Sequence, residues 1–430
     1  MVKKLQSSIR WKILAFLFLI SVVTYIDRVN ISVAGKEMMR EYGLSSVGLG
    51  EIFSAFVLGY ALFQIPGGWI GDIWGPRRVL TFAVIWWSFF TILTALANEL
   101  FLSTLLGVFG ALFIVRFLIG MGEAAALPNF NRTVANWFPP SERGIGVGVS
   151  IGGIGVGSAL TPPFVTWIML RYGWKMTFFI TGGVGFAVAV GWYLFARDAP
   201  REHPGVNSYE LDWITRASDQ EYSITQKLAS KSFVSVLRNR SVWYLTLSYT
   251  MLGYIAYIYL SWFFLYLVNI RNFTVLRGSF LATAPFIAMS AFSPFGGWIT
   301  DKLTQRYGRK KGRRTVGSIG MFLTSIFIYS GAMAVDPYLA IFFLSLGAGI
   351  LYGTVGAFWT STIDISKEHS GALSGLMNMG ANLGGTISPT LTPWLGEKFG
   401  WPVALSVAAG AAFLGGILWF GVEFKERGRP

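Results

Sequence analysis

The sequence predicts an all-α integral membrane protein, with twelve transmembrane helices arranged as two six-helix bundles related by pseudo-symmetry. The first reason is composition: of the 430 residues, 53% are hydrophobic and 13% are charged, whereas soluble domains carry about 25% charged residues. The second reason is that apolar stretches of the roughly 20 residues needed to cross a bilayer follow one another along the whole chain. The third reason is that the two halves of the chain repeat several short motifs in the same order.

Each expected helix is an apolar run bounded by polar, glycine or proline residues. In chain order, we expect helices at 11–34, 47–71, 79–98, 103–127, 143–169, 175–196, 241–269, 275–300, 315–335, 338–363, 371–396 and 401–422. Most of the 35 Lys and Arg residues fall before the first run, after every second run and after the last one. Because Lys and Arg are enriched in cytoplasmic loops, we expect both termini on the cytoplasmic side. The net charge of +14 then reflects topology and does not indicate nucleic-acid binding.

The repeated motifs divide the chain into two halves. GGWIGD at 67–72 recurs as GGWITD at 296–301, and RYGW at 171–174 recurs as KFGW at 398–401. A long polar segment with charges of both signs separates the sixth and seventh runs. We therefore predict an N-terminal six-helix bundle at 1–196, a cytoplasmic linker at 197–240 and a C-terminal six-helix bundle at 241–430. Repeats in the same orientation place a binding site between the bundles near the membrane midplane, with access alternating as they rock.

Four charged side chains fall inside the expected helices. Asp27 and Arg28 are adjacent in the first run, and Arg116 and Glu123 are seven residues apart in the fourth. A charge at the bilayer centre costs about 2.5–3.5 kcal/mol on insertion scales, and such residues usually face a polar cavity. A guanidinium group matches a carboxylate and keeps its charge at working pH, so two buried arginines predict transport of an anion. The alternative is that each arginine only pairs with an acid in the fold, Arg116 with Glu123, and locks the helices together.

Several longer motifs resemble a known family. GGWIGDIWGPRR (67–78) resembles the loop signature between the second and third helices of the major facilitator superfamily. YIDRVNISVA (25–34), RFLIGMGEAAALPNFNR (116–132) and NWFPPSERG (136–144) together resemble its anion:cation symporter family. That family includes bacterial carriers of galactonate, glucarate and hexuronates, and it is related to sialin and the vesicular glutamate transporters. The resemblance implies proton-coupled import of a small organic anion, a sugar acid such as galactonate, gluconate or a hexuronate, through alternating access.

The resemblance also assigns roles to residues. Asp27 and Glu123 would couple proton movement to transport, and Arg28 would bind the substrate carboxylate. The substrate-binding candidates are Arg28, Arg116, Tyr25, Tyr60, Trp359, Asn378 and Asn382. The two asparagines are one helical turn apart, so their amides share a face. For these uncharged residues the alternatives are interfacial placement of the tyrosines, helix–helix bonding by the asparagines and packing of Trp359.

A second set of charged residues lies at the expected cytoplasmic side. The resemblance implies that a cytoplasmic gate is formed by Asp72, Arg77, Arg78, Arg132, Glu142 and Arg143. The alternative is that these charges only fix the topology of the chain.

The fifth run departs from the family. Ile151, Gly152 and Ile154 stand where sugar-acid carriers commonly have polar residues, so one expected contact to the substrate is missing. This departure weakens the assignment of one particular substrate from the family to this chain.

Other functions are less well supported by the sequence. Cysteine is absent, which excludes disulfides and thiolate chemistry. His203 and His369 have no partner at ligand spacing, and no catalytic constellation is apparent, so we expect no metal, no cofactor and no enzyme. A sodium-coupled or facilitated anion carrier and, with less support, a proton-driven drug exporter remain as alternatives. We expect a monomer in the inner, or plasma, membrane of a cell, with the bilayer, a small organic anion and protons as its partners.

Overall fold

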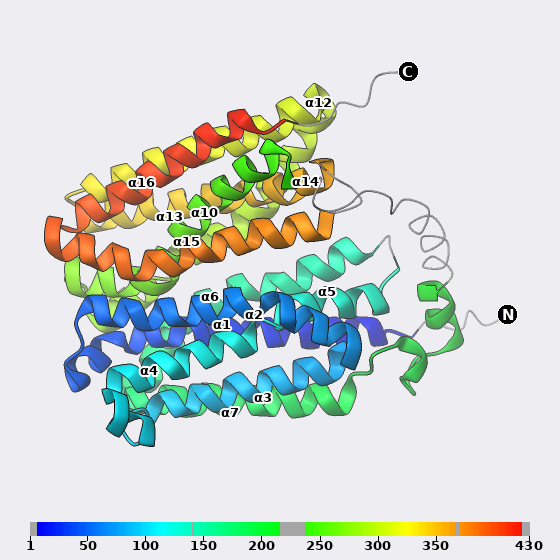
Figure 1. The fold of residues 1–430 in the computed structure, drawn as a ribbon, viewed down its shortest axis with the longest axis horizontal. Coiled ribbons are helices and arrows are strands. Elements are labelled where there is room, and N and C mark those ends of the chain that lie inside the picture. Colours follow the sequence, from blue (N-terminus) through cyan, green and yellow to red (C-terminus); the bar gives the residue numbers. More distant parts are fainter. Residues whose placement is uncertain (1–6, 140–141, 216–236, 366–369, 424–430) are drawn as a thin grey trace.

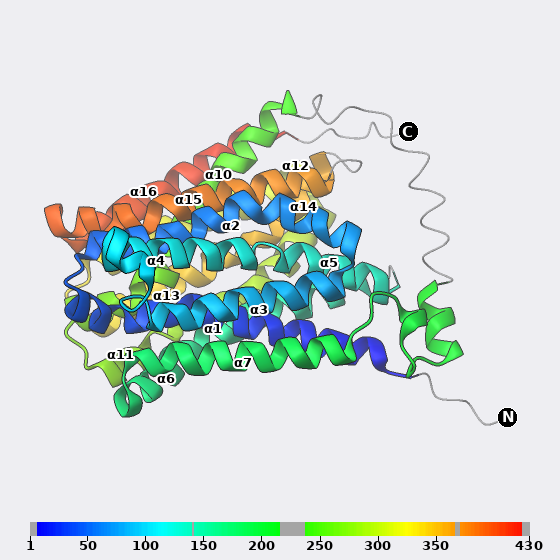
Figure 2. The same ribbon diagram turned by 60° about the horizontal axis from the view of Figure 1, so that its bottom comes forward.

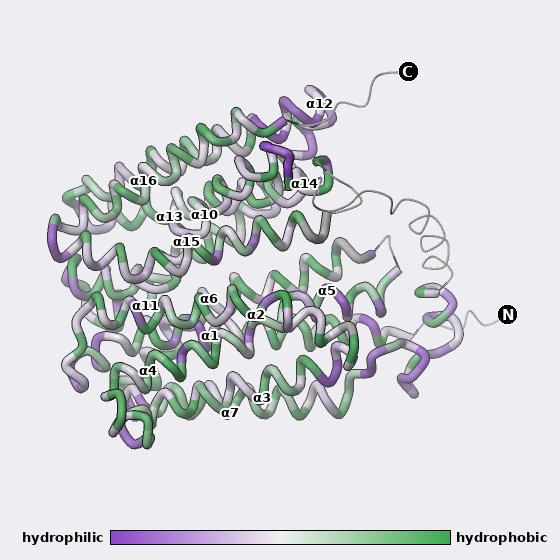
Figure 3. The backbone as a smooth tube through the Cα atoms, viewed as in Figure 1, coloured by the Kyte–Doolittle hydropathy of each residue, from purple (hydrophilic) through white to green (hydrophobic). Residues whose placement is uncertain are grey.

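The computed structural model describes residues 7–139, 142–215, 237–365 and 370–423. Within these ranges the chain is helical and contains no strand. Figure 1 shows long helices lying side by side, with the N- and C-termini at the same end of the molecule. We call this end the terminal end and the opposite one the far end. Figure 3 shows hydrophilic residues gathered at the terminal end beyond the largely apolar helices.

The first half of the chain forms one group of helices, which we call the N-half. It consists of α1 (Ile9–Tyr42), α2 (Ser46–Trp74), α3 (Pro76–Ala95), α4 (Phe101–Glu123), α5 (Ala126–Trp137), α6 (Arg143–Tyr172) and α7 (Trp174–Phe195). A short helix, η1 (Pro200–Glu202), follows. The α4 and α5 helices together cross the molecule once, as the candidate span Phe101–Trp137.

The second half forms the other group, the C-half, which lies above the N-half in Figure 1. It consists of α10 (Arg240–Leu265), η2 (Tyr266–Ile270), α11 (Val275–Leu281), α12 (Ala284–Met333), α13 (Pro337–Gly353), α14 (Val355–Ile365), α15 (Ser370–Phe399), α16 (Trp401–Leu418) and η3 (Trp419–Gly421). The view in Figure 2 shows the same helices turned by 60°.

Twelve crossings follow from these elements. Ten segments of the described chain are long and apolar enough to span a membrane. One of them, Val275–Met333, crosses twice, because the backbone turns at Gly308 with a φ of 83° that favours glycine. The α15 helix, with 30 residues, adds one more crossing and brings the total to twelve. The predicted fold class, an all-α membrane protein with twelve helices in two bundles, is confirmed.

Glycines set the closest helix contacts in both halves, at equivalent places. A Cβ on Gly157 of α6 would lie 2.6 Å from the Val22 carbonyl oxygen of α1. A Cβ on Gly384 of α15 would lie 2.2 Å from the Thr250 carbonyl oxygen of α10. Small residues allow membrane helices to approach this closely. Because Gly157 and Gly384 are 227 residues apart, the repeat in the sequence is also a repeat in the packing.

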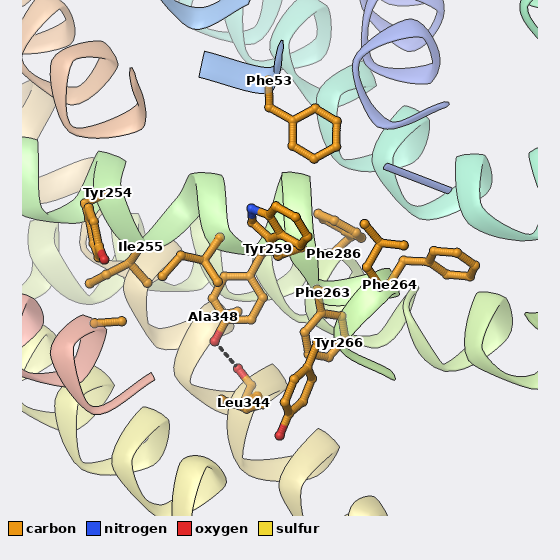
Figure 4. Packing of buried hydrophobic residues seen from close by; sticks show 14 of the residues in the cluster. Phe53, Tyr254, Ile255, Tyr259, Phe263, Phe264, Tyr266, Phe286, Leu344 and Ala348 are labelled. Atoms are coloured by element: carbon orange, nitrogen blue, oxygen red, sulfur yellow. Dashed lines mark hydrogen bonds between the residues drawn. The ribbon is translucent and has the colours of Figure 1, made fainter. Parts of the chain in front are cut away.

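The two halves meet at the far end. The Phe53 ring of α2 lies 5.7 Å from the Trp262 ring of α10, in an edge-to-face arrangement. The Ser54 hydroxyl of α2 lies 2.9 Å from the Thr390 hydroxyl of α15. Figure 4 shows Phe53 reaching toward the aromatic residues of α10, where the Tyr259 hydroxyl donates to the Leu344 carbonyl oxygen. These apolar and polar contacts close the far end between the halves.

The segment after α7 packs on the terminal end of the N-half. Residues 208–215 are helical, and the Glu210 carboxylate accepts hydrogen bonds from the Ile9 and Arg10 amides, at 3.2 and 3.1 Å. It also pairs with the Arg10 guanidinium at 3.1 Å. The first turn of a helix has unpaired amides and a positive dipole end. Glu210 therefore acts as a carboxylate cap on α1, about 200 residues away along the chain.

Candidate substrate and ion-coupling site

Arg28 lies at the centre of the candidate site, on the long helix α1. Its Nε atom lies 2.6 Å from Oε2 of Glu123, at the end of α4. The two side chains are 7% and 0% exposed. A charge-assisted hydrogen bond this short, between nearly buried groups, is among the stronger polar contacts in proteins. The sequence-based alternative paired Glu123 with Arg116, and the structure pairs it with Arg28 instead.

Aromatic rings surround the Arg28 guanidinium. Its Cζ atom lies 4.5 Å from the Tyr60 ring centroid, 4.7 Å from that of Tyr25 and 5.1 Å from that of Phe56. Its Nη1 atom also donates to the Tyr25 hydroxyl at 3.3 Å. Contacts of a cation with ring faces at these distances are attractive, and more so when water is excluded. The rings thus stabilise the positive charge of Arg28 together with the Glu123 carboxylate.

Arg116 approaches the same aromatic group from α4. Its Cζ atom lies 4.9 Å from the Phe56 ring centroid. The side chain is buried, and Nε has no hydrogen-bond partner among the described residues. The helices α2 and α4 come close enough for this contact because a Cβ on Gly120 would lie only 2.0 Å from the Phe56 carbonyl oxygen. Both arginines therefore lie within about 5 Å of one ring.

The C-half contributes polar groups on the facing side. The Tyr257 hydroxyl of α10 donates to Oδ1 of Asn382 at 3.3 Å, and Nδ2 of Asn382 lies 3.5 Å from Oε1 of Gln64 in α2. Tyr257 and Tyr352 lie within electrostatic reach of Arg28. The site is thus formed between the halves.

Two other predicted residues of the C-half make no described hydrogen bond to Arg28, Asn382 or Gln64. The indole Nε1 of Trp359 donates to the Tyr249 hydroxyl at 3.0 Å, which ties α14 to α10 within the C-half. Asn378 lies one turn before Asn382 on α15 and is half-buried.

Asp27 points away from this site, although it is next to Arg28 in the chain. Successive helical residues are rotated by about 100°, so the two side chains cannot share a face. Asp27 is fully buried inside the N-half, and the Thr181 hydroxyl of α7 is in position to hydrogen-bond its carboxylate. The charged groups closest to it electrostatically are Glu123 and Arg116.

The predicted gate residues lie at the terminal end, and those with described contacts bind within the N-half and its linker. Nε and Nη2 of Arg77 donate to the Tyr193 carbonyl oxygen at 3.1 and 2.7 Å. Glu142 pairs with Arg10 at 3.0 Å and accepts from the Trp213 indole at 3.1 Å. Arg78 and Arg132 are exposed. The side chains of Asp72 and Arg143, and the residue His369, lie outside what the structure describes.

The comparisons with known proteins decide the family. The family model described as Major Facilitator Superfamily matches residues 17–364 and 278–430. The chain belongs to the major facilitator superfamily. The probable galactarate/D-glucarate transporter GudP of Escherichia coli K12 is 32% identical over 396 residues, which cover 87% of this chain and 84% of that protein. The probable sulfoacetate transporter SauU of Cupriavidus necator is 32% identical over 378 residues, covering 86% and 84%.

A solved structure agrees with the fold. A bacterial homologue of the human lysosomal transporter Spinster, in an inward-facing and unoccupied conformation, superimposes with a TM-score of 0.75 at 18% identity. The match covers 98% of this chain and all of that one. As a superfamily member, the chain is a multi-pass membrane transporter and not an enzyme, and the resemblance seen in the motifs is confirmed.

Sequence reasoning missed several groups of the site in this superfamily member. Phe56 was not singled out, because a phenylalanine in an apolar helix carries no signal of its own. Tyr257 is one of six tyrosines in the seventh run, and only the fold shows that it lies near Arg28. Tyr352 in the tenth run was not singled out, because a tyrosine in an apolar helix carries no signal of its own. Among the described residues, no three His, Cys, Asp or Glu side chains come together as a metal site.

Proposed function

We propose that this protein imports a small organic anion, a sugar acid such as galactonate, gluconate or a hexuronate, by proton symport through alternating access. The observation that carries the proposal is the buried Arg28–Glu123 pair with its aromatic surroundings. The relatives named as galactarate/D-glucarate and sulfoacetate transporters support an anion with a carboxylate or a sulfonate.

The pair supplies a coupling mechanism. An incoming carboxylate competes with Glu123 for the guanidinium of Arg28, because the planar guanidinium group prefers to form a bidentate pair with one carboxylate. Burial disfavours a charged carboxyl group, and loss of its cation removes the compensation. Glu123 therefore takes up a proton when the substrate binds, and it returns the proton when the substrate leaves and the ion pair forms again.

Other residues complete the proposed site. Asp27 is the second proton-coupling acid. The groups that contact or orient the substrate are Arg116, Tyr25, Tyr60, Trp359, Asn378 and Asn382, with the hydroxyl and amide groups binding the polyol. At the terminal end the cytoplasmic gate comprises Asp72, Arg77, Arg78, Arg132, Glu142 and Arg143.

The proposal also includes the organisation of the chain in the membrane. A bundle at 1–196 and a bundle at 241–430 rock about the site, and the linker is 197–240. Both termini lie in the cytoplasm, the protein resides in the inner (plasma) membrane, and it functions as a monomer.

The test is uptake of labelled sugar acids into proteoliposomes under an imposed pH gradient. Wild type should concentrate at least one member of a panel of galactonate, gluconate, glucarate and glucuronate. Arg28→Ala should lose binding and uptake, because the cation that receives the carboxylate is gone. Arg277→Ala is the matched control, since Arg277 is an exposed far-end arginine that stacks on Tyr338 at 5.3 Å. Equal uptake by Arg28→Ala and wild type would refute the proposed role of Arg28.

A further inference from the structure

The first part of α12 carries an exposed stripe that changes from apolar to basic toward the terminal end. Ile287, Phe295 and Trp298 each have more than half of their surface exposed, and Lys302 and Arg306 follow as exposed basic residues. These positions are three, four or eight residues apart, so they share one face of the helix. In a chain whose helices span a membrane, large apolar side chains that are exposed in this way face lipid.

The apolar part of the stripe ends in a contact suited to the membrane interface. The Phe295 and Trp298 rings are stacked, with centroids 5.7 Å apart and an interplanar angle of 22°. The Nζ atom of Lys302 lies 4.0 Å from the Trp298 ring centroid, which is an attractive distance for a cation and a ring. Tryptophan is enriched where the hydrocarbon layer meets the headgroups, and a lysine beside it extends its ammonium group toward them. The contact therefore places the charge of Lys302 at the level of lipid phosphates.

A surplus of positive charge surrounds this contact. Residues 301–314 contain seven Lys and Arg residues and one acid, Asp301. Asp301 and Asp364 of α14 pair with arginines of this segment at 3.2 to 3.4 Å. Neither Lys302 nor Arg306 forms an ion pair with an acid in the described part of the chain. Figure 3 shows hydrophilic residues at this corner of the terminal end, so the positive charge is open to an anion from outside the protein.

The repeat in the sequence provides a comparison within the molecule. The counterpart of Trp298 is Trp69 of α2, 229 residues earlier, which is also exposed. The counterpart of Lys302 is Ile73, an exposed apolar residue. Both halves thus present a tryptophan at this level, but only the C-half places a lysine over it and continues into a strongly basic segment. The basic stripe is a feature of the C-half alone.

We propose that Trp298, Lys302 and Arg306 form a binding site for the headgroup of an anionic phospholipid, in the leaflet next to the terminal end. Clusters of four to eight Lys and Arg residues directly beyond a membrane helix attract anionic lipids. The lipid phosphate lies against Lys302 and Arg306, and the acyl chains cover the apolar part of the stripe, including Phe295. The proposal goes beyond anion transport, and its test involves no transport, so the two proposals can fail separately.

The test is lipid binding to the detergent-purified protein, measured by native mass spectrometry with phosphatidylglycerol and phosphatidylcholine of the same acyl chains. Wild type should bind phosphatidylglycerol more tightly. Lys302→Ile introduces the residue type that the N-half has at this position, and it should weaken phosphatidylglycerol binding about fivefold, equivalent to about 1 kcal/mol for one lysine near an anionic surface. Lys398→Ile is the matched control, because Lys398 is an exposed far-end lysine whose Nζ atom lies 5.2 Å from the Trp394 ring centroid.

A second pair of variants separates a defined site from a general attraction of positive charge. Trp298→Ala keeps every charge but removes the ring under Lys302, so it should weaken phosphatidylglycerol binding, whereas Trp69→Ala should not. Equal binding of the two lipids by wild type would overturn the proposal, as would equal effects within either pair of variants. A folded variant is recognised because it still binds phosphatidylcholine, and Arg306→Gln replaces Lys302→Ile if that variant does not fold.

Discussion

Gly50 should control how tightly the two halves close at the far end. It lies on α2 where this helix crosses α15 of the other half, and a Cβ there would meet backbone atoms. The new atom would lie 2.1 Å from the Pro389 carbonyl oxygen and 3.1 Å from the Thr390 Cα. Because the obstacle is backbone from the partner half, rotation of a side chain cannot relieve it. Gly50→Ala should therefore force the halves apart at this end.

The magnitude follows from the geometry. Real Cβ contacts are essentially never shorter than 3.0 Å, so α2 and α15 must separate by about 1 Å. Overpacking of this kind costs about 1–3 kcal/mol. At 1.36 kcal/mol for each factor of ten, the population closed at the far end should fall by roughly 5-fold to 150-fold relative to the population open there.

The assay is the rate of thiol labelling at one introduced cysteine. The chain has no cysteine of its own, so Ser54→Cys, at the contact with Thr390, reports on the far end alone. Adding Gly50→Ala should raise its labelling rate. Gly48→Ala is the control, since a Cβ there meets only side chains of the N-half, at 3.4 Å or more. Equal labelling with Gly50→Ala and with Gly48→Ala would refute the reasoning.

Three further predictions concern coupling, the substrate site and the linker. Glu123→Gln should keep anion exchange across the membrane but lose accumulation driven by a pH gradient, and accumulation that survives would make Glu123 purely structural. Tyr257→Phe removes a hydrogen bond to Asn382 of 3.3 Å, so KM should rise about threefold to tenfold with kcat unchanged; an unchanged KM would place Tyr257 outside the site. Burial and the nearby Arg197 lower the pKa of His203, so the packed arrangement of residues 197–215 favours the neutral imidazole. As the pH falls through about 6.5, proteolysis of the linker should accelerate in wild type and not in His203→Gln, and equal acid sensitivity would contradict this role.

The fold could be predicted from the sequence because the bilayer imposes a long apolar run on each crossing. The limits of the helices could not. We expected the first helix to end near 34, but α1 continues to Tyr42, since charged residues remain helical once the chain leaves the apolar layer. The fourth run was expected to be continuous over 103–127, whereas α4 ends at Glu123 and α5 begins at Ala126. Hydropathy does not register such a break.

The site could be predicted in part for a related reason. A charge in an apolar run is visible in the sequence, so Asp27, Arg28, Arg116 and Glu123 were all found. Their pairing was not, because Arg28 and Glu123 are 95 residues apart in the chain and only the folded structure brings their side chains together. Uncharged groups in apolar helices have the opposite problem: tyrosines such as Tyr257 and Tyr352 are common there, and only the fold shows which of them lie near Arg28.

Asp27 and Arg28 are adjacent on α1, so one helix carries both the proposed anion-binding arginine and the second proposed proton-coupling acid. A rotation of about 100° per residue sends Arg28 toward the C-half and Asp27 into the N-half, so in the proposed mechanism the anion and the proton on Asp27 bind on opposite sides of α1. Glu123 acts on both, because it pairs with Arg28 and also lies close enough to Asp27 to influence its charge. In this mechanism, once a substrate displaces Glu123 from Arg28, the repulsion between Glu123 and Asp27 is no longer compensated, and a proton at either acid relieves it. Coupling in this mechanism needs no direct contact between the anion and the proton. A variant in which Glu123 and Asp27 no longer influence each other's charge should therefore transport the anion without accumulating it.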